Sequence, residues 1–152
     1  MTPSPSGPPQ TDQWWRDALA AALSSPVVRA APLSGGCVGE VLGVQLADGR
    51  RVVAKIDRSV NPSLTIEARS LEALAQRGGL PTPRVLHTQD RLLVSEFIPS
   101  GPGLSVQGER HAAELLARLH SVVPDPPNSA RFGYDGDTLI AGLPQPNPWT
   151  DS

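Results

Sequence analysis

Lys55 and Glu67 are two residues of this sequence whose types and spacing could do chemistry together. Lys55 stands inside the apolar, β-branched stretch Val52–Asp57, which is typical of a buried strand. Glu67 falls on the apolar stripe of a helix predicted over 61–79, one turn before Leu71. An unpaired carboxylate on a packed face is strongly disfavoured, so Glu67 needs a partner, and Lys55 is the obvious candidate. A lysine held in this way can bind phosphate groups.

The same two residues also allow a reading without a ligand. A lysine in a strand is usually an edge or solvent-facing residue, and a helix glutamate is usually exposed. The predicted elements around Lys55 and Glu67 must therefore decide between a phosphate-binding pair and two solvent-facing residues. For the helix we expect Asn61 as N-cap, Pro62 at the first helical position and a stop at Gly78-Gly79. Its apolar stripe is predicted to consist of Leu64, Leu71, Leu74 and Ala75.

Length and composition limit the classes of protein to which this sequence can belong. A chain of 152 residues suits one domain with a respectable core. Charged residues are 18% and the net charge is -2, so no basic footprint points to nucleic acid or to an anionic membrane as partner. No apolar run approaches the roughly 20 residues of a membrane span, and no secretion signal is visible. One cysteine excludes an intrachain disulfide, and we expect a reducing cytoplasm.

The N-terminal part predicts a leader, a helix and two strands. Residues 1–10 hold four prolines and should be a disordered leader. Residue 11 or 12 then caps a helix that runs to about residue 24 and carries Trp14 and Trp15. The two tryptophans could form a partner-binding patch, but packing against a sheet is favoured. Strands are expected over 27–33 and 40–46.

A glycine-containing loop joins those two strands. Glycines let backbone N–H groups approach an oxyanion closely, so this loop is a candidate cover for a phosphate. The loop lacks the ending of a P-loop and the full G-x-G-x-x-G pattern, and many hairpins carry such glycines without any ligand. The candidate residues are Gly35, Gly36, Cys37, Val38 and Gly39.

The middle of the chain predicts an α+β fold. Asp48-Gly49 between apolar runs favours a type I′ hairpin turn into the strand that carries Lys55. After the helix, strands are expected over 84–88 and 91–97. Three strands, one packed helix and two strands, in a five-stranded antiparallel sheet, resemble the small lobe of protein kinases. In that pattern Glu96, Phe97 and Ile98 would stand at the hinge and bind adenine through the backbone.

A second amphipathic helix is predicted over 108–122, and from Pro124 onward the chain is expected to be loop-like. His111 and His120 on this helix, and His87 in a strand, have no second ligand at metal spacing, so we expect no metal site. His120 stands in the last turn, where it can interact with free carbonyls and the helix dipole.

The C-terminal segment over residues 131–151, called the tail below, carries a more specific resemblance. Over roughly residues 13 to 152 the chain resembles the fructosamine kinase (ketosamine-3-kinase) family, relatives of aminoglycoside phosphotransferases with a protein-kinase-like fold. The matching stretches stand in family order, and the most distinctive is the last. They are Gly36-Cys37-Val38, Val53-Ala54-Lys55, Glu67 to Leu74, Leu93 to Glu96, Leu115 to His120, Phe132-Gly133-Tyr134, and Pro144-Gln145 with Asn147 and Trp149.

This resemblance implies an activity and roles for residues. Members of the family transfer the γ-phosphate of ATP, with Mg²⁺, to the 3-hydroxyl of a ketosamine, on a small molecule or a glycated protein, and so remove the adduct. By resemblance Lys55 would hold the phosphates, Glu67 would orient Lys55, residues 35–39 would cover the nucleotide and 96–98 would bind adenine. Residues 11–98 would form the nucleotide-binding small lobe, and 99–152 the hinge, a linker helix and the start of a large lobe.

The chain departs from the family pattern in one major respect. Phosphoryl transfer needs a base and metal ligands, which in relatives follow a His-Gly-Asp segment beyond Trp149. We therefore expect no catalytic residue and no metal ligand in this chain, which reads as a small lobe plus linker. A non-catalytic nucleotide-binding or interaction module, or an inactive truncated fragment, remain alternatives. A smaller departure is Asp137-Thr138, where relatives often have Asp-Asn.

The resemblance also makes Cys37 a redox candidate, because some members form a disulfide between two subunits from this position. A small loop residue without that role is the alternative. If Cys37 pairs between subunits, peroxide will produce a homodimer on non-reducing electrophoresis, and Cys37→Ser will abolish it. Absence of the dimer, or a dimer that survives Cys37→Ser, contradicts the hypothesis.

Overall fold

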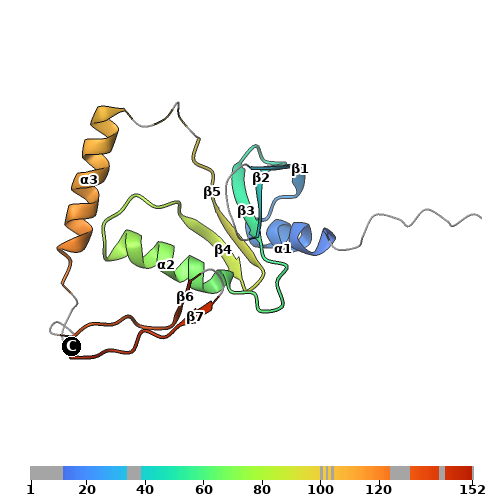
Figure 1. The fold of residues 1–152 in the computed structure, drawn as a ribbon. Helices are drawn as coiled ribbons and strands as arrows, with labels where there is room; N and C mark the ends of the chain where they lie inside the picture. Colours follow the sequence, from blue (N-terminus) through green and yellow to red (C-terminus); the bar gives the residue numbers. More distant parts are fainter. Residues whose placement is uncertain are drawn as a thin grey trace, which may run out of the picture.

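The computed structural model describes residues 12–33, 39–99, 101, 103, 105–123, 131–140 and 143–151. Five strands in these ranges form one antiparallel sheet in the order β1-β2-β3-β5-β4, and two short strands pair separately (Figure 1). The predicted α+β class and five-stranded sheet are confirmed. In chain order the elements are α1 Gln13–Leu23, β1 Val27–Pro32, β2 Glu40–Leu46, β3 Arg51–Ile56, α2 Leu64–Gln76, β4 Val85–Gln89, β5 Leu92–Glu96, α3 Val106–His120, β6 Thr138–Ile140 and β7 Leu143–Gln145.

The sheet buries side chains on both faces, and neighbouring residues of one strand divide between them. In β5, Leu92 and Val94 belong to the main core with Trp15 of α1, whereas Leu93 belongs to a smaller cluster with α2. Helices α1 and α2 therefore cover opposite faces of the sheet, as Figure 1 shows. Alternate residues of β3 are buried in the main core, and Lys55 lies between two of them. This alternation directs Lys55 toward the α2 side.

Helix α1 supports the sheet from the first face. Trp15 is 2% exposed and Leu19 is fully buried, and Trp14 packs partly against the same core. The preference for core packing over a partner-binding patch is thus confirmed for Trp15. The helix ends at Ser24 in the left-handed region, whose N–H bonds the carbonyl of Ala20.

The turn between β2 and β3 differs from the predicted type I′. That type needs positive φ at both central residues, but Asp48 is not among the positive-φ residues, and Gly49 has φ 88°. The N–H of Gly49 bonds the carbonyl of Leu46, and the N–H of Leu46 bonds that of Arg50. This is a three-residue loop with glycine in the left-handed position, so the predicted pairing of the strands holds although the turn type was wrong.

Helix α2 begins later than predicted. Ser63, not Asn61, precedes the first helical residue Leu64, and Pro62 lies outside the helix. The reason is Asp57, whose carboxylate accepts bonds from the N–H groups of Ser59 at 2.8 Å and Ser63 at 3.3 Å. This Asx-type arrangement orders the connection that leads into the helix. Leu64 is buried as predicted, but the predicted stripe residue Ala75 is exposed.

The second half of the chain is more regular than the sequence indicated. Helix α3 starts at Val106 rather than 108, because the Ser105 hydroxyl accepts a bond from the N–H of Gly108 and caps it. The tail predicted as loop contains the hairpin of β6 and β7. Among the described residues, no helix is long and apolar enough to cross a membrane. The predicted leader over 1–10 lies outside the described residues.

Asp57 generates the first structural prediction. Burial acts to raise the pKa of this 5%-exposed carboxyl, but the bonds from Ser59 and Ser63 and the charge of Arg91 lower its pKa below the usual value. A group with a depressed pKa in the folded state stabilises the fold above its unfolded pKa of about 3.9, and this contribution is lost as pH falls below it. Asp57→Ala should cost about 1–3 kcal/mol at pH 7 in urea unfolding.

The cost of Asp57→Ala should shrink as the pH falls below about 4, because the Asp57 carboxyl group of the unfolded chain then binds a proton that the folded carboxylate, with its lower pKa, does not yet bind. Asp17→Ala, on the exposed face of α1, is the control and should stay within about 0.5 kcal/mol of wild type. A cost for Asp57→Ala that is small at pH 7, or that grows on acidification, contradicts the role assigned to Asp57.

Candidate functional site

The predicted pair of Lys55 and Glu67 is present in the structure. Lys55 Nζ lies 2.6 Å from Glu67 Oε2, which is both a hydrogen bond and an ion pair. The Lys55 side chain is 22% exposed and the Glu67 side chain 42% exposed. The expectation that Glu67 sits on the packed face was therefore only partly right. Leu64 and Ala68 form the buried face of α2, and Glu67 lies at its edge, where a ligand can reach the pair.

The strand neighbours of Lys55 fix its distance to α2. Lys55 is paired with Val41 of β2 on one side and with Leu93 of β5 on the other. Leu93 is buried against Leu64 and Ala68 of α2. Since the residue beside Lys55 is the one on which the helix packs, the sheet register brings the ammonium and the carboxylate together.

Gly39 is the one residue of the predicted glycine loop that the structure describes, and it lies against Lys55. Its φ is +82°, a backbone conformation that residues with a Cβ rarely adopt. A Cβ at this position would come 2.9 Å from the carbonyl oxygen of Ile56 and 3.7 Å from Lys55 Cε. The loop thus returns to the sheet beside the lysine. The other predicted loop residues, Gly35, Gly36, Cys37 and Val38, lie outside the described residues.

The base of that loop is held by a charge network. Arg58 Nη2 lies 2.6 Å from Asp12 Oδ1 and 3.0 Å from Glu40 Oε2. Glu40 is the first residue of β2, directly after Gly39. Arg58 therefore ties the end of the loop to the start of α1.

The predicted hinge residues follow β5 directly. Glu96 pairs with Val52, and its N–H bonds the carbonyl of Arg84 at 2.9 Å. The Phe97 ring lies under the guanidinium of Arg51, with 3.8 Å from Cζ to the ring centroid, a cation–π contact. Ile98 is 54% exposed. Phe97 is thus anchored beside the start of β3, while the Ile98 side chain lies in solvent.

Lys55 is also the only lysine in the sequence, and the other twelve cationic residues are arginines. An ammonium is a compact charge with rotatable donors, whereas a guanidinium is a planar fork, so the two are not interchangeable at a phosphate. The sequence analysis used the position of Lys55 in a predicted strand but did not use the fact that the sequence contains no other lysine.

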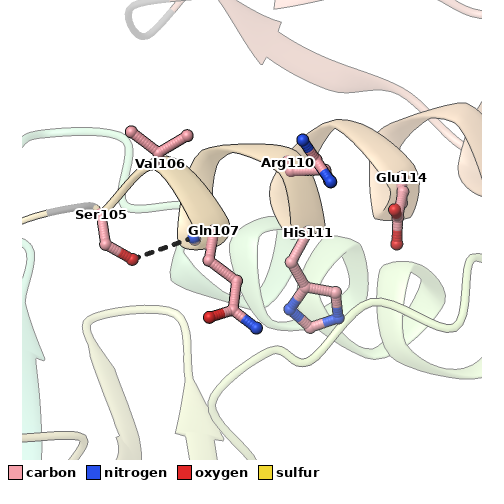
Figure 2. Close-up of a pocket in the computed structure, with 7 residues that line it drawn as sticks. Ser105, Val106, Gln107, Arg110, His111 and Glu114 are labelled. Atoms are coloured by element: carbon pink, nitrogen blue, oxygen red, sulfur yellow. Dashed lines mark hydrogen bonds between the residues drawn. The ribbon is translucent and has the colours of Figure 1, made fainter.

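A pocket that is lined by His111 does not include the ion pair. It has a volume of about 890 Å³ and lies at the start of α3 (Figure 2). Gln107 and His111 project from one side of the helix there, and Val106 and Arg110 from the other. These are exposed side chains at the helix start. The Lys55–Glu67 pair is the better candidate site, because its geometry matches a specific chemistry.

Metal binding has no support from the part of the chain that the structure describes. There, no group of three or more His, Cys, Asp or Glu is arranged to hold a metal ion. His111 and His120 are exposed on α3, and His87 lies in β4 with its Nε2 buried and without a hydrogen-bond partner within the described ranges.

Sequence reasoning missed several residues that hold α2. Asp57 was read only as the end of a strand, although a serine two residues later is a recognisable Asx-turn pattern. Asp135 was not singled out at all, yet it bonds both Arg77 at the end of α2 and Trp149 of the tail. Because Arg77 and Asp135 are 58 residues apart, no local pattern could have found that pair.

Comparison with known proteins decides the family. A model of the family described as fructosamine kinase matches residues 10–152. The chain belongs to the fructosamine kinase family. The resemblance drawn from the sequence motifs is confirmed over nearly the whole chain.

Named relatives agree with this membership. The chain is 34% identical over 126 residues to a probable ketoamine kinase of Synechocystis, which covers 79% of this chain and 40% of the relative. It is 26% identical over 133 residues to a chloroplastic protein-ribulosamine 3-kinase of Arabidopsis thaliana, covering 84% of this chain and 39% of the relative. The chain spans about 40% of the length of these curated fructosamine kinase relatives.

Solved structures show the same fold. A structure from Haemophilus somnus that carries the name fructosamine-3-kinase superposes with a TM-score of 0.74, covering 90% of this chain and 47% of that one. One from Thermobifida fusca with the same name gives a TM-score of 0.71, covering 89% and 46%. Each of these two structures is 23% identical in sequence to this chain, so they establish the fold of this fructosamine kinase family member and no more.

Gly39 generates a prediction with an internal control. Gly39→Ala and Gly49→Ala both place a Cβ at a positive φ, which costs about 1–2 kcal/mol. Only Gly39 faces a backbone oxygen, because nothing lies within 4 Å of a Cβ at Gly49. Gly39→Ala should therefore destabilise more than Gly49→Ala in chemical denaturation. Equal costs would show that the close approach of the loop end to β3 is not a constraint.

Proposed function

We propose that this chain binds the phosphates of ATP through Lys55, held in place by Glu67. The observation that carries the proposal is the 2.6 Å contact between Lys55 Nζ and Glu67 Oε2 on the α2 face of the sheet. A lysine on the third strand, paired with a helix carboxylate, is the arrangement with which kinases hold the α- and β-phosphates. Family membership makes ATP the expected nucleotide.

Each part of the site has a role in this proposal. The Lys55 ammonium donates to the phosphate oxygens, and Glu67 keeps it from swinging into solvent. Residues 35–39 cover the phosphates, and 96–98 bind adenine through backbone groups. The position of Gly39 beside Lys55 supports the first of these, and the anchoring of Phe97 by Arg51 supports the second. Mg²⁺ arrives with ATP, as its complex with the phosphates.

The proposed reaction follows from the names of the relatives, which are kinases of ketoamines and ribulosamines. In it the γ-phosphoryl group of ATP passes to a sugar hydroxyl of a ketosamine, on a small amine or a glycated protein. The P–O bond to ADP breaks, a bond to the hydroxyl oxygen forms, and the hydroxyl proton is released. The phosphorylated adduct is then less stable, which is the chemistry of protein deglycation.

The proposal also divides the chain. Residues 11–98 form the nucleotide-binding small lobe, and residues from 99 onward provide the hinge, the linker helix α3 and the start of a second lobe. The chain carries the phosphate-binding lysine, and the chemistry at the sugar belongs to groups of that second lobe. A reducing cytoplasm is the compartment we assign, in keeping with a single cysteine.

A second candidate function is a nucleotide-binding or interaction module that performs no transfer. The observation in its favour is a set of exposed apolar side chains on α3 and the tail, which suits contact with another surface. They are Val106, Leu116, Val122, Val123, Phe132, Ile140 and Leu143. A coupled ADP assay with a glycated lysine analogue separates the two candidates when the second lobe with its catalytic groups is present, since a kinase then forms ADP in a Lys55-dependent way and a binding module does not.

ATP binding itself gives the main prediction. Millimolar MgATP should raise the melting temperature of this chain, because a ligand that binds only the folded state stabilises it by about 1.4 kcal/mol at ten times its Kd. Lys55→Ala should abolish the shift, and Glu67→Gln should reduce it. Lys55→Arg keeps the charge but not the ammonium geometry, so it is the matched control and should give a smaller shift than wild type.

Two outcomes of this titration contradict the proposal. One is the absence of any shift at millimolar MgATP. The other is a shift that persists in Lys55→Ala, which would place the nucleotide elsewhere.

A further inference from the structure

The tail of the chain lies along α2, on the side away from the sheet. A cavity of about 380 Å³ is lined by residues of α2, the end of α3 and the tail together. Leu74 of α2, Leu119 of α3 and Trp149 of the tail are among its walls. Figure 1 shows the tail passing beside α2 on this side. Helix α2, which carries Glu67, is therefore enclosed between the sheet and the tail.

Asp135 joins the tail to the end of α2. Its Oδ2 accepts a bond from Arg77 Nη2 at 2.9 Å, and its Oδ1 accepts one from Trp149 Nε1 at 3.0 Å. Arg77 is the C-cap residue of α2. The Arg77 guanidinium, and then the Trp149 indole, hold the pKa of the Asp135 carboxyl below its usual value, so it stays ionised at neutral pH.

The segment that presents Asp135 is itself braced. Asn147 Nδ2 lies 2.9 Å from Thr138 Oγ1, and 3.0 Å and 3.3 Å from the carbonyl oxygens of Gln145 and Gly136. At Gly133 a Cβ would come within 2.8 Å of the Pro148 carbonyl oxygen, so the two arms of the tail are in close contact. Asp135 therefore projects from a cross-linked support.

The support acts on α2 at a point remote from Glu67. Ten residues separate Glu67 from Arg77, which is about 15 Å along a helix. Leu64 and Ala68 fix the N-terminal half of α2 against the sheet, whereas the C-terminal end is held by the tail. A helix gripped at one end alone can tilt, and a tilt moves Glu67 relative to Lys55.

We propose that Asp135 is a positioning residue: by holding Arg77 against the Trp149 side of the tail, it fixes the angle of α2 at which Glu67 meets Lys55. The inference deepens the ATP-binding role proposed above and assigns a task to Trp149, Asn147 and Asp135. Its test needs no nucleotide, so it can fail or succeed independently of that role.

Lys55 is the only lysine, so its acylation by acetic anhydride can be followed by mass spectrometry with the N-terminal amine as internal reference. Acetic anhydride reacts with the neutral amine, so Lys55 must leave Glu67 and release a proton to solvent before it is acylated, and all rates are compared at one pH. Asp135→Asn keeps an acceptor for Trp149 but removes the charge that holds Arg77. We expect it to raise the Lys55 acylation rate about 2- to 5-fold, the range of a partly exposed ion pair. Asp151→Asn breaks the Arg131 ion pair of the same tail and should leave the rate unchanged.

A double-mutant cycle shows whether Asp135 acts through Glu67. In the Glu67→Gln background, Asp135→Asn should add no further increase. Trp149→Phe is a second variant that keeps the aromatic packing and removes the indole donor, and it should raise the rate in the same direction. It serves as the deciding variant if Asp135→Asn lowers the melting temperature by more than Asp151→Asn does.

Three results overturn the proposal. The first is an unchanged Lys55 rate in both Asp135→Asn and Trp149→Phe. The second is an increase of equal size in the Glu67→Gln background, which would mean that Asp135 acts without Glu67. The third is an equal increase in Asp151→Asn, which would mean general loosening of the tail. A wild-type chain that fails to bind ATP refutes the proposed function and leaves the acylation result standing.

Discussion

The ion pair of Lys55 and Glu67 is the interaction on which the site depends. It joins a strand to a helix across the α2 face of the sheet, with 2.6 Å between Nζ and Oε2. A partly exposed ion pair contributes about 0–1 kcal/mol to stability, so the fold does not need it. The ion pair matters because it holds the Lys55 ammonium near the surface in a fixed direction, where its other N–H groups can donate to an anion.

Most other features of the structure act on this pair through the position of α2. Leu93, the strand neighbour of Lys55, packs under the first two turns of the helix. Asp57 orders the connection before α2 by accepting bonds from two backbone N–H groups. At the other end of α2, Asp135 accepts a bond from Arg77, the C-cap residue. Two carboxylates thus secure the two ends of one helix. The glycine at the end of the first loop leaves room for the lysine side chain to reach across.

Sequence reasoning reached the elements whose pattern is local. The apolar alternation of β2 and β3, the stripe on α2 and the motifs of the family gave the sheet, its order of elements and the Lys55–Glu67 pair. It placed the start of α2 two residues early, at Pro62 instead of Leu64, because it did not foresee that the Asp57 carboxylate accepts a bond from the N–H of Ser63. It also missed the β6–β7 hairpin, whose three-residue strands are too short for a periodic pattern. Long-range partners such as Arg77 and Asp135 leave no trace in local sequence.

Phosphate binding by the Lys55 ammonium is the central claim, and the singularity of this lysine allows one direct measurement. A chain labelled with ¹³Cε,¹⁵Nζ-lysine gives one lysine side-chain NMR signal, from Lys55. Titration with MgATP should shift that signal to saturation, whereas adenosine, which has no phosphate, should leave it in place. A Lys55 signal that stays unchanged while the chain is saturated with MgATP would contradict the account.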